Sequence, residues 1–551
     1  MCGIIILVRH FHPLSSSAVN TVYLSRYTFE IVSQLDQEAS TVAAAIREWR
    51  NSFLPINHFP PEVLALIPNH LPYQLDLIRL CSVCRYWRKT FINHAVLWSK
   101  FTLTLDVGAI CITTWLQRAR TSPLEIISTG TEGADTLALL QPYVRQFGSL
   151  SLIHHSWSDV QQFAIAASGP LPIMHNLRIH ITGFNPDDPK ISSRPNCPLF
   201  SGAIHVRTFT LCAEGLPHLD HFPFSSLRTF QLLVTPEGTF ADEKAFPVRQ
   251  LLDFLEATPV LEILTLKICA DTSLDSVPQG RIVILPNVKR CHVTGKDPGF
   301  NIALHLSCPS ADHTSVVCEH DANDLTIQDP LSTPIMWCRI LPQYLPNQAD
   351  ALSLESIAFN DVTCFLSFVS GSTTLQVGYK IIVDGDDDTP WPSMEAEYAE
   401  VLSQASRVIR TYPLLPNIRQ LGIHDNNSPV SPQLLQHIIN EVSQLFMSLG
   451  PLDHLMLETS NLLPYLAPFI YGPNGSNALG SWFKYPQIFV LTIADKSEQP
   501  LNGASEDGIV EFAKSQHALG ILFDKVDLQI TTSNAQMAER LQRWVGSVHC
   551  K

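Results

Sequence analysis

Two cysteines separated by two residues, Cys81 and Cys84, have a spacing found in redox and zinc sites. A structural zinc site needs four ligands, and no second pair of this kind accompanies them. The pair also falls inside a segment that we expect to be helical. We therefore interpret both cysteines as core residues.

Other clusters of potential ligands are also incomplete. His154-His155 and the pair His218 and His221 have no convincing carboxylate or cysteine partner nearby, so we expect surface or loop histidines. The run Asp386–Asp388 lacks the alternating ligands of a calcium loop, which favours a solvated loop or a contact for a basic partner. The glycine-rich segment GPNGSNALG lacks the Lys-Ser/Thr of a phosphate loop. With no G-x-S-x-G or H-E-x-x-H motif present, we predict no enzyme, no cofactor and no metal site.

The composition indicates a folded protein without affinity for nucleic acid or membranes. Of 551 residues, 45% are hydrophobic and 16% are charged, and the formal net charge is −15. The 13 cysteines are scattered, as is typical of reduced thiols inside a cell. The apolar run near the N-terminus, Ile4 to Val8, is too short for a signal peptide, and no stretch approaches the ~18 apolar residues of a membrane helix. We expect a cytoplasmic or nuclear location.

Residues 1–17 look irregular, and the pattern becomes helical over 18–54. Apolar residues recur there at steps of three and four. They are Phe29, Val32, Leu35, Ala39, Val42, Ala45, Ile46 and Trp49. We favour an amphipathic helix that packs on a neighbouring part of the chain. A coiled-coil dimer is the alternative, disfavoured because the run is short and rich in alanine.

The segment "HFPPEVLALI", His58 to Ile67, predicts a short helix. Pro60 and Pro61 suit a first helical turn, and Glu62 favours the same position through the helix dipole. Val63, Leu64 and Ile67 should form one apolar face, and Pro68 should end the helix about two turns in.

A second helix should follow over 77–92, with Asp76 as its N-cap. Its apolar stripe consists of Leu77, Leu80, Cys84, Trp87 and Phe91, with Val83 beside it. A third short segment ends in Leu97-Trp98. So small an apolar unit needs a partner or a neighbouring domain. It is also basic, with a net charge of about +3 over 59–101, which suggests an acidic docking partner.

The order and spacing of these residues resemble an F-box, the helical motif that docks on the Skp-type adaptor of cullin–RING ubiquitin ligases. Two departures are Phe59, where that family usually has Leu, and Pro68. The stretch "AICITTWLQRARTSPLEI", 109–126, extends the resemblance to basidiomycete F-box proteins. The partner-binding residues implied are Pro60, Pro61, Glu62, Leu64, Ile67, Leu71, Pro72, Leu77, Leu80, Val83, Cys84, Trp87, Leu97 and Trp98.

The pattern L-x-x-L-x-L, which is typical of leucine-rich repeats, recurs loosely in ten segments after residue 120, of which LEILTLKIC and IRQLGIHDN fit it best. The ten segments are FGSLSLI, MHNLRIHI, VRTFTL, LRTFQL, LEILTLKIC, VKRCHV, LESIAF, IRQLGIHDN, LDHLML and IFVLTI. The alternative is an irregular α/β fold with amphipathic strands. Near the C-terminus, "AQMAERLQRWVGSV" predicts a helix with Leu541 and Trp544 inward, which could cap the solenoid.

The predicted fold class is α/β: a helical F-box at 55–105, then an irregular leucine-rich-repeat-like solenoid at 106–551. The predicted function is the substrate-recognition subunit of a Skp–cullin–RING ubiquitin ligase, with an unknown protein as target. The alternative is a solenoid scaffold with a degenerate F-box and no role in ubiquitin transfer.

Overall fold

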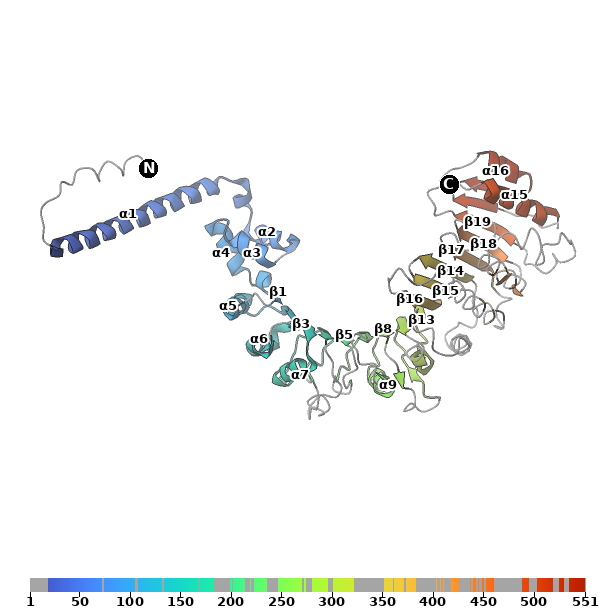
Figure 1. Ribbon diagram of the computed structural model, residues 1–551, viewed down its shortest axis with the longest axis horizontal. Coiled ribbons are helices and arrows are strands. Elements are labelled where there is room, and N and C mark those ends of the chain that lie inside the picture. The colour runs from blue at the N-terminus through green and yellow to red at the C-terminus, as the bar shows by residue number, and fades with distance from the viewer. Residues whose placement is uncertain are drawn as a thin grey trace. The chain divides into compact units, whose positions relative to one another are not determined.

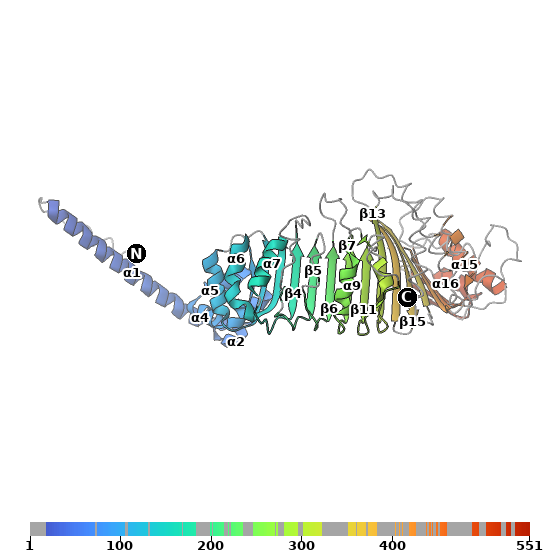
Figure 2. The same cartoon turned by 90° about the horizontal axis from the view of Figure 1, so that it is seen from below.

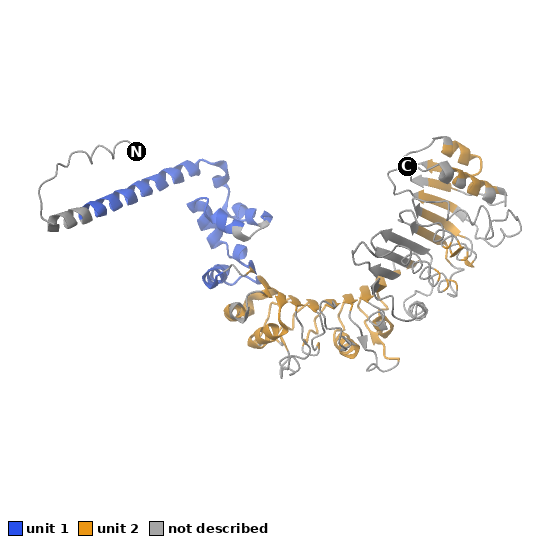
Figure 3. Ribbon diagram, in the orientation of Figure 1, with its two compact units in different colours: residues 1–102, 107–124 blue, residues 103–106, 125–551 orange. Residues whose placement is uncertain are grey.

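The computed structural model divides the chain into two compact units (Figure 3). The first comprises 1–102 and 107–124, and the second comprises 103–106 and 125–551. The structure describes residues from 18 to 550 with gaps, of which the longest are 183–198, 235–245, 322–350, 383–402, 411–417, 426–436, 460–487 and 495–502.

The first unit begins with helix α1, Ala18–Ser52, as the sequence predicts. The large apolar side chains described on this helix, from Tyr27 onward, are exposed, and Trp49 is 67% exposed. The predicted packing of this face on a neighbouring part of the chain is therefore wrong for the described side chains of α1.

Short helical segments make up the rest of the first unit (Figure 1). They are η2 Pro55–His58, α2 Pro61–Leu64, η3 Ile67–His70, α3 Gln74–Cys81, α4 Arg85–Asn93, η4 Ala95–Trp98 and α5 Ala109–Ala119. The strand β1, Lys100–Leu103, follows η4. Pro61 and Glu62 occupy the first turn of α2, as predicted.

The helix boundaries differ from the predicted ones at Pro68 and between Cys81 and Cys84. Pro68 does not end a two-turn helix; α2 is a single turn, and Pro68 lies in the first turn of η3, where its missing N–H costs nothing. The predicted second helix is two helices, since α3 ends at Cys81 and Cys84 is the N-cap of α4. Asp76 lies in the first turn of α3 and is not its cap.

The second unit is a long sheet of mostly parallel strands with helices between them. Its strands are β2 Leu124–Thr129, β3 Phe147–His155, β4 Asn176–Ile181, β5 Thr208–Ala213, β6 Thr229–Val234, β8 Ile263–Ile268, β11 Arg290–Gly295, β13 His313–Asp321, β14 Ala351–Phe359, β15 Asp361–Ser370, β16 Thr373–Ile382, β17 Gln420–Asp425, β18 Leu452–Thr459, β19 Ile488–Ala494, β20 Lys525–Gln529 and β21 Val548–Cys550. Figure 2 shows β4, β5, β6 and β11 side by side in one row.

The helices of the second unit connect these strands. They are α6 Gly133–Leu140, η6 Gln141–Gln146, α7 Trp157–Ala166, α9 Val248–Glu256, η8 Asn301–His305, α15 Gly503–Ala518 and α16 Ala535–Gln542. Two small parallel pairs complete the unit, β7 Phe246–Pro247 with β9 Thr272–Ser273, and β10 Val283–Ile284 with β12 Leu306–Ser307. Figure 1 shows α6, α7 and α9 on one side of the row of strands.

Alternation of side chains places the core on the helix side of this sheet. In β5, alternate residues are buried, and Phe209 stacks on Phe230 of the next strand with ring centroids 5.6 Å apart. Phe254 of α9 packs on the same Phe230 ring at 4.9 Å. Every second residue is thus buried in β2, β4, β5, β6 and β8, as in leucine-rich-repeat-like solenoids, whereas β13 is buried on both faces from Thr314 to Glu319.

All ten segments that carry the repeat pattern are strands, which confirms the sequence prediction. The strand order departs from a simple repeat at one place. β13 pairs with β16, and β15 runs antiparallel between β16 and β14, which in turn pairs with β17. The predicted C-terminal helix ends at Gln542, and β21 follows it as a further strand beside β20. Leu541 is buried as predicted.

Candidate partner-binding site

Trp98 anchors the core of the first unit. Its side chain is 1% exposed, and its indole Nε1 donates to the carbonyl oxygen of Phe91 at 2.8 Å. Trp115 of α5 meets its ring edge-on at 4.6 Å, and the guanidinium of Arg118 lies 4.4 Å from the ring centre. Helix α5 therefore closes the core over the short helices that precede it.

Trp87 connects α4 to the chain in front of α2. Its indole Nε1 donates to Oδ1 of Asn57 at 2.6 Å, and the Nδ2 of Asn57 donates to the carbonyl of Asn51 at 2.6 Å. The Cys84 sulfur accepts from the backbone N–H of Trp87 at 3.5 Å, so this thiol acts as the helix cap. These bonds fix η2 and α4 to the end of α1.

The sequence-predicted partner residues divide into three groups by exposure. The buried group consists of Leu64, Leu77, Trp87 and Trp98. The half-buried group consists of Ile67, Leu71, Leu80, Cys84 and Leu97. The exposed group consists of Pro60, Pro61, Glu62 and Val83, while Pro72 lies outside the described residues. The first group forms the unit's own core, so substituting those residues would disturb folding as well as any docking.

Exposed apolar side chains around α2 were not selected from the sequence as partner residues. Phe59, Val63 and Leu66 are 48%, 44% and 57% exposed, and we call these three residues the α2 apolar set. Tyr86 of α4 lies beside them, because its hydroxyl donates to the carbonyl of Phe59 at 2.9 Å. The sequence could have indicated the exposure of Val63, because successive residues of a helix differ by 100° and Leu64 is fully buried.

The basic side chains of this unit are partly neutralised within the chain. Arg79 pairs with Asp76 at 2.8 Å, and Arg85 pairs with Glu48 of α1 at 3.0 Å. Both arginines are solvent-exposed, although Asp76 is half-buried, so each pair contributes little to stability. A partner that offered carboxylates could still exchange with them.

A comparison with known protein families identifies this group of short helices. Residues 56–104 match the F-box-like family. The matched segment runs from η2 to just beyond β1, and it includes the α2 apolar set and the core tryptophans Trp87 and Trp98. A search of curated proteins found no match to this chain.

The cysteine pair considered from the sequence as a redox or zinc site, Cys81 and Cys84, lies within the F-box-like domain. Burial raises the pKa of the Cys81 thiol, outweighing the opposing charges of Arg118 and Arg88. Cys81 is therefore held as a thiol, consistent with a core role. Among the described residues, no group of histidine, cysteine and carboxylate side chains is arranged to hold a metal ion. In the part of the chain described, no helix is long and apolar enough to span a bilayer.

The histidine pair at the end of β3 was expected at a surface or in a loop, and this is wrong for one member. His155 is completely buried, and its Nε2 lies 3.0 Å from the Oγ of the buried Ser128. A register shift in β3 between Ile153 and His155 turns the His155 side chain inward and leaves His154 exposed. The pair His218 and His221, the run Asp386–Asp388 and the GPNGSNALG segment lie outside the described residues.

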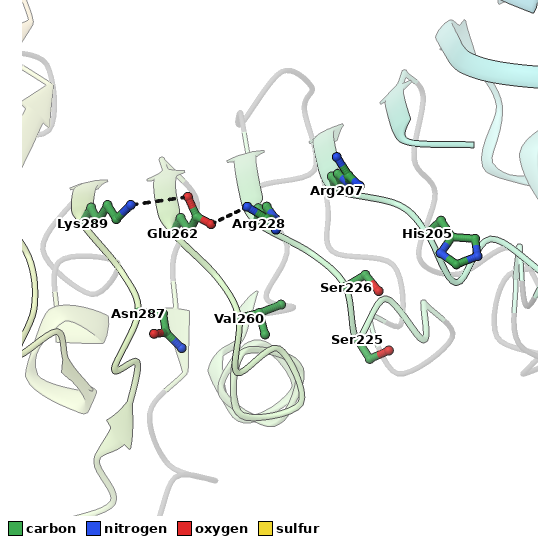
Figure 4. A pocket seen from close by; sticks show the side chains of 9 residues that line it. All are labelled: His205, Arg207, Ser225, Ser226, Arg228, Val260, Glu262, Asn287 and Lys289. Atoms are coloured by element: carbon green, nitrogen blue, oxygen red, sulfur yellow. Dashed lines mark hydrogen bonds and ion pairs between the residues drawn. The ribbon is translucent and has the colours of Figure 1, made fainter. Parts of the chain in front are cut away.

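The repeat unit carries a charged hollow of about 530 Å³ at the N-terminal ends of its strands (Figure 4). Its floor is a ladder in which the backbone N–H of Arg228 donates to Arg207 O, that of Glu262 to Arg228 O and that of Lys289 to Glu262 O. Glu262 pairs with Arg228 at 2.9 Å and with Lys289 at 3.8 Å. Arg207 makes no ion pair with a described residue, so the hollow carries a net positive charge.

Proposed function

We propose that this chain is the substrate-recognition subunit of a Skp–cullin–RING ubiquitin ligase. The F-box-like match at 56–104 carries this proposal, because such domains suggest a substrate-adaptor role. The chain itself performs no chemistry in this scheme. It brings a target protein close to the ubiquitin-conjugating machinery, and the gain in rate comes from proximity.

The adaptor would bind the α2 apolar set and the exposed members of the sequence-predicted group. Phe59, Val63 and Leu66 present apolar surface that no described part of the chain covers. Burial of about 25 cal/mol per Å² of such surface would drive docking. The buried Leu64, Trp87 and Trp98 would support this surface from beneath.

The target would bind the repeat unit, and the hollow around Arg207 is the place where we expect an acidic segment of it. Arg207 and Arg228 are exposed and aligned on adjacent strands, a spacing that suits carboxylates along an extended peptide. A scaffold without a ubiquitin role was suggested by Pro68. That residue fits the first turn of η3, so it no longer favours this alternative.

Co-purification with a Skp-type adaptor tests the proposal. Leu66→Glu should abolish co-purification, since a carboxylate would be desolvated at the interface, while thermal stability stays near that of the wild type. Ile110→Glu is the matched control, because Ile110 is 85% exposed in the same unit but lies outside the matched segment. The proposal fails if the wild-type chain captures no adaptor, or if Leu66→Glu captures as much as Ile110→Glu.

A further inference from the structure

Helix α1 carries an apolar stripe with strict alternation of three- and four-residue steps. The stripe consists of Val32, Leu35, Ala39, Val42, Ile46 and Trp49, and Phe53, the residue after the helix, continues it. Steps of three and four keep a stripe on one face of a helix and are the spacing of a coiled-coil seam. Trp49 and Phe53 meet edge-on at 5.0 Å, so these two side chains share a face at the end of the stripe.

The stripe faces away from the rest of the first unit. Glu48, which pairs with Arg85 of α4, lies about 150° around the helix from the centre of the stripe, at 100° per residue. Val42 and Ile46 are each 59% exposed, and Phe53 is 63% exposed. An exposed apolar surface of this size indicates a surface that binds a partner.

The side-chain sizes along the stripe are complementary to the same stripe read in reverse. In an antiparallel pair centred near position 44, Leu35 lies opposite the second copy's Phe53, Ala39 opposite its Trp49, and Val42 opposite its Ile46. The largest side chain thus meets the smallest, as close packing requires. In a parallel pair Trp49 would face Trp49 and Ala39 would face Ala39, which combines overpacking with a void.

The charges beside the stripe favour the same orientation. Asp36 and Glu38 lie beside the first half of the stripe, whereas Arg47 and Arg50 lie beside its second half, where the one acidic residue, Glu48, pairs with Arg85. In the antiparallel pair Asp36 lies beside the second copy's Arg50, and two-fold symmetry repeats the contact. Neither Asp36 nor Arg50 makes an ion pair with a described residue of its own chain. In a parallel pair these two positions would be about 21 Å apart along the axis.

We propose that α1 is a homodimerisation element, and that the stripe binds the same stripe of a second copy in antiparallel orientation. The interface is self-complementary in both shape and charge, so a single patch on each chain suffices. This inference rests on α1 alone and does not depend on the F-box-like domain binding an adaptor.

The mass of the full chain in solution tests dimerisation. Light scattering at micromolar concentration should give about twice the 61.3 kDa of one chain for the wild type, and about that single mass for Val42→Asp. Val42→Asp places a charge at the centre of the seam. The control Ser40→Asp adds the same charge on the opposite face of α1 and should remain dimeric. A monomeric wild-type chain with intact helicity overturns the proposal.

Charge reversal tests the orientation. Asp36→Arg and Arg50→Asp should each raise the dissociation constant several-fold, because each places like charges side by side. The double variant restores opposite charges and should recover the wild-type dissociation constant. A dimer whose double variant is as weak as the single ones would contradict the antiparallel register.

Discussion

His155 shows how a polar side chain is accommodated in the core of the repeat unit. Burial lowers its pKa below the ordinary 6.5, and the nearby carboxylate of Asp159 opposes this shift only in part. Its Nε2 bonds to Ser128, while Nδ1 has no hydrogen-bond partner among the residues that the structure describes. The neutral ring is therefore the form that the folded state holds.

The stability of the chain should fall as the pH drops below about 6.5. The unfolded chain takes up a proton at His155 near that pH, whereas the folded chain takes it up only at lower pH. His155→Gln, which can still bond to Ser128, should show a smaller drop in melting temperature between about pH 7.5 and about pH 5.5.

His205→Gln is the control for this measurement, since His205 is exposed in the hollow. Its drop in melting temperature should equal that of the wild type. An equal drop in His155→Gln would show that His155 does not contribute. Because His292 and His454 also have pKa values lowered by burial, His155→Gln should reduce the drop without removing it.

At the scale of elements, the sequence predicts helices better than it predicts their ends. The stripe of Leu77, Leu80, Cys84 and Trp87 keeps helical spacing through the break between α3 and α4. The hydrophobic periodicity therefore did not indicate the turn between α3 and α4. The N-cap of α4 is Cys84, and cysteine is not among the preferred capping residues, so the capping preferences did not indicate the turn either.

The turns behind neighbouring strands stack closely at Gly202. A Cβ built on Gly202 would lie 2.2 Å from the carbonyl oxygen of Gly169, a distance that no side chain can occupy without a backbone shift. The N–H of Leu171 donates to the carbonyl of Gly202 at 3.0 Å, so such a shift would also disturb a hydrogen bond.

Gly202→Ala should destabilise the repeat unit by about 1–3 kcal/mol, as overpacking does elsewhere. Gly169→Ala is a matched control from the same contact, because a Cβ there would meet nothing within 4 Å. Chemical denaturation of the two variants measures the difference. Equal stabilities would mean that the two turns separate without cost.

At the scale of the molecule, the sequence predicted which segments are strands but not how all of them pair. Each of the ten repeat segments carries its own apolar alternation, so each could be recognised alone. The pairing of β13 with β16 joins residues about sixty positions apart, and no local pattern encodes it. The same holds for the partner-binding site. The sequence predicted its helices, but tertiary packing determines that Trp98 is buried and Leu66 is exposed.

Dimerisation through α1 and docking through the α2 apolar set are compatible on one chain. The Glu48–Arg85 pair shows that α4 meets α1 on the side away from its stripe. We therefore expect the wild-type chain and a Skp-type adaptor to form a complex of two chains and two adaptors, measured by native mass spectrometry.

Val42→Asp should give one chain with one adaptor, and Leu66→Glu should give a dimer of chains without adaptor. A single adaptor on the wild-type dimer would mean that the two surfaces obstruct each other. Loss of adaptor from Val42→Asp would mean that docking requires the dimer.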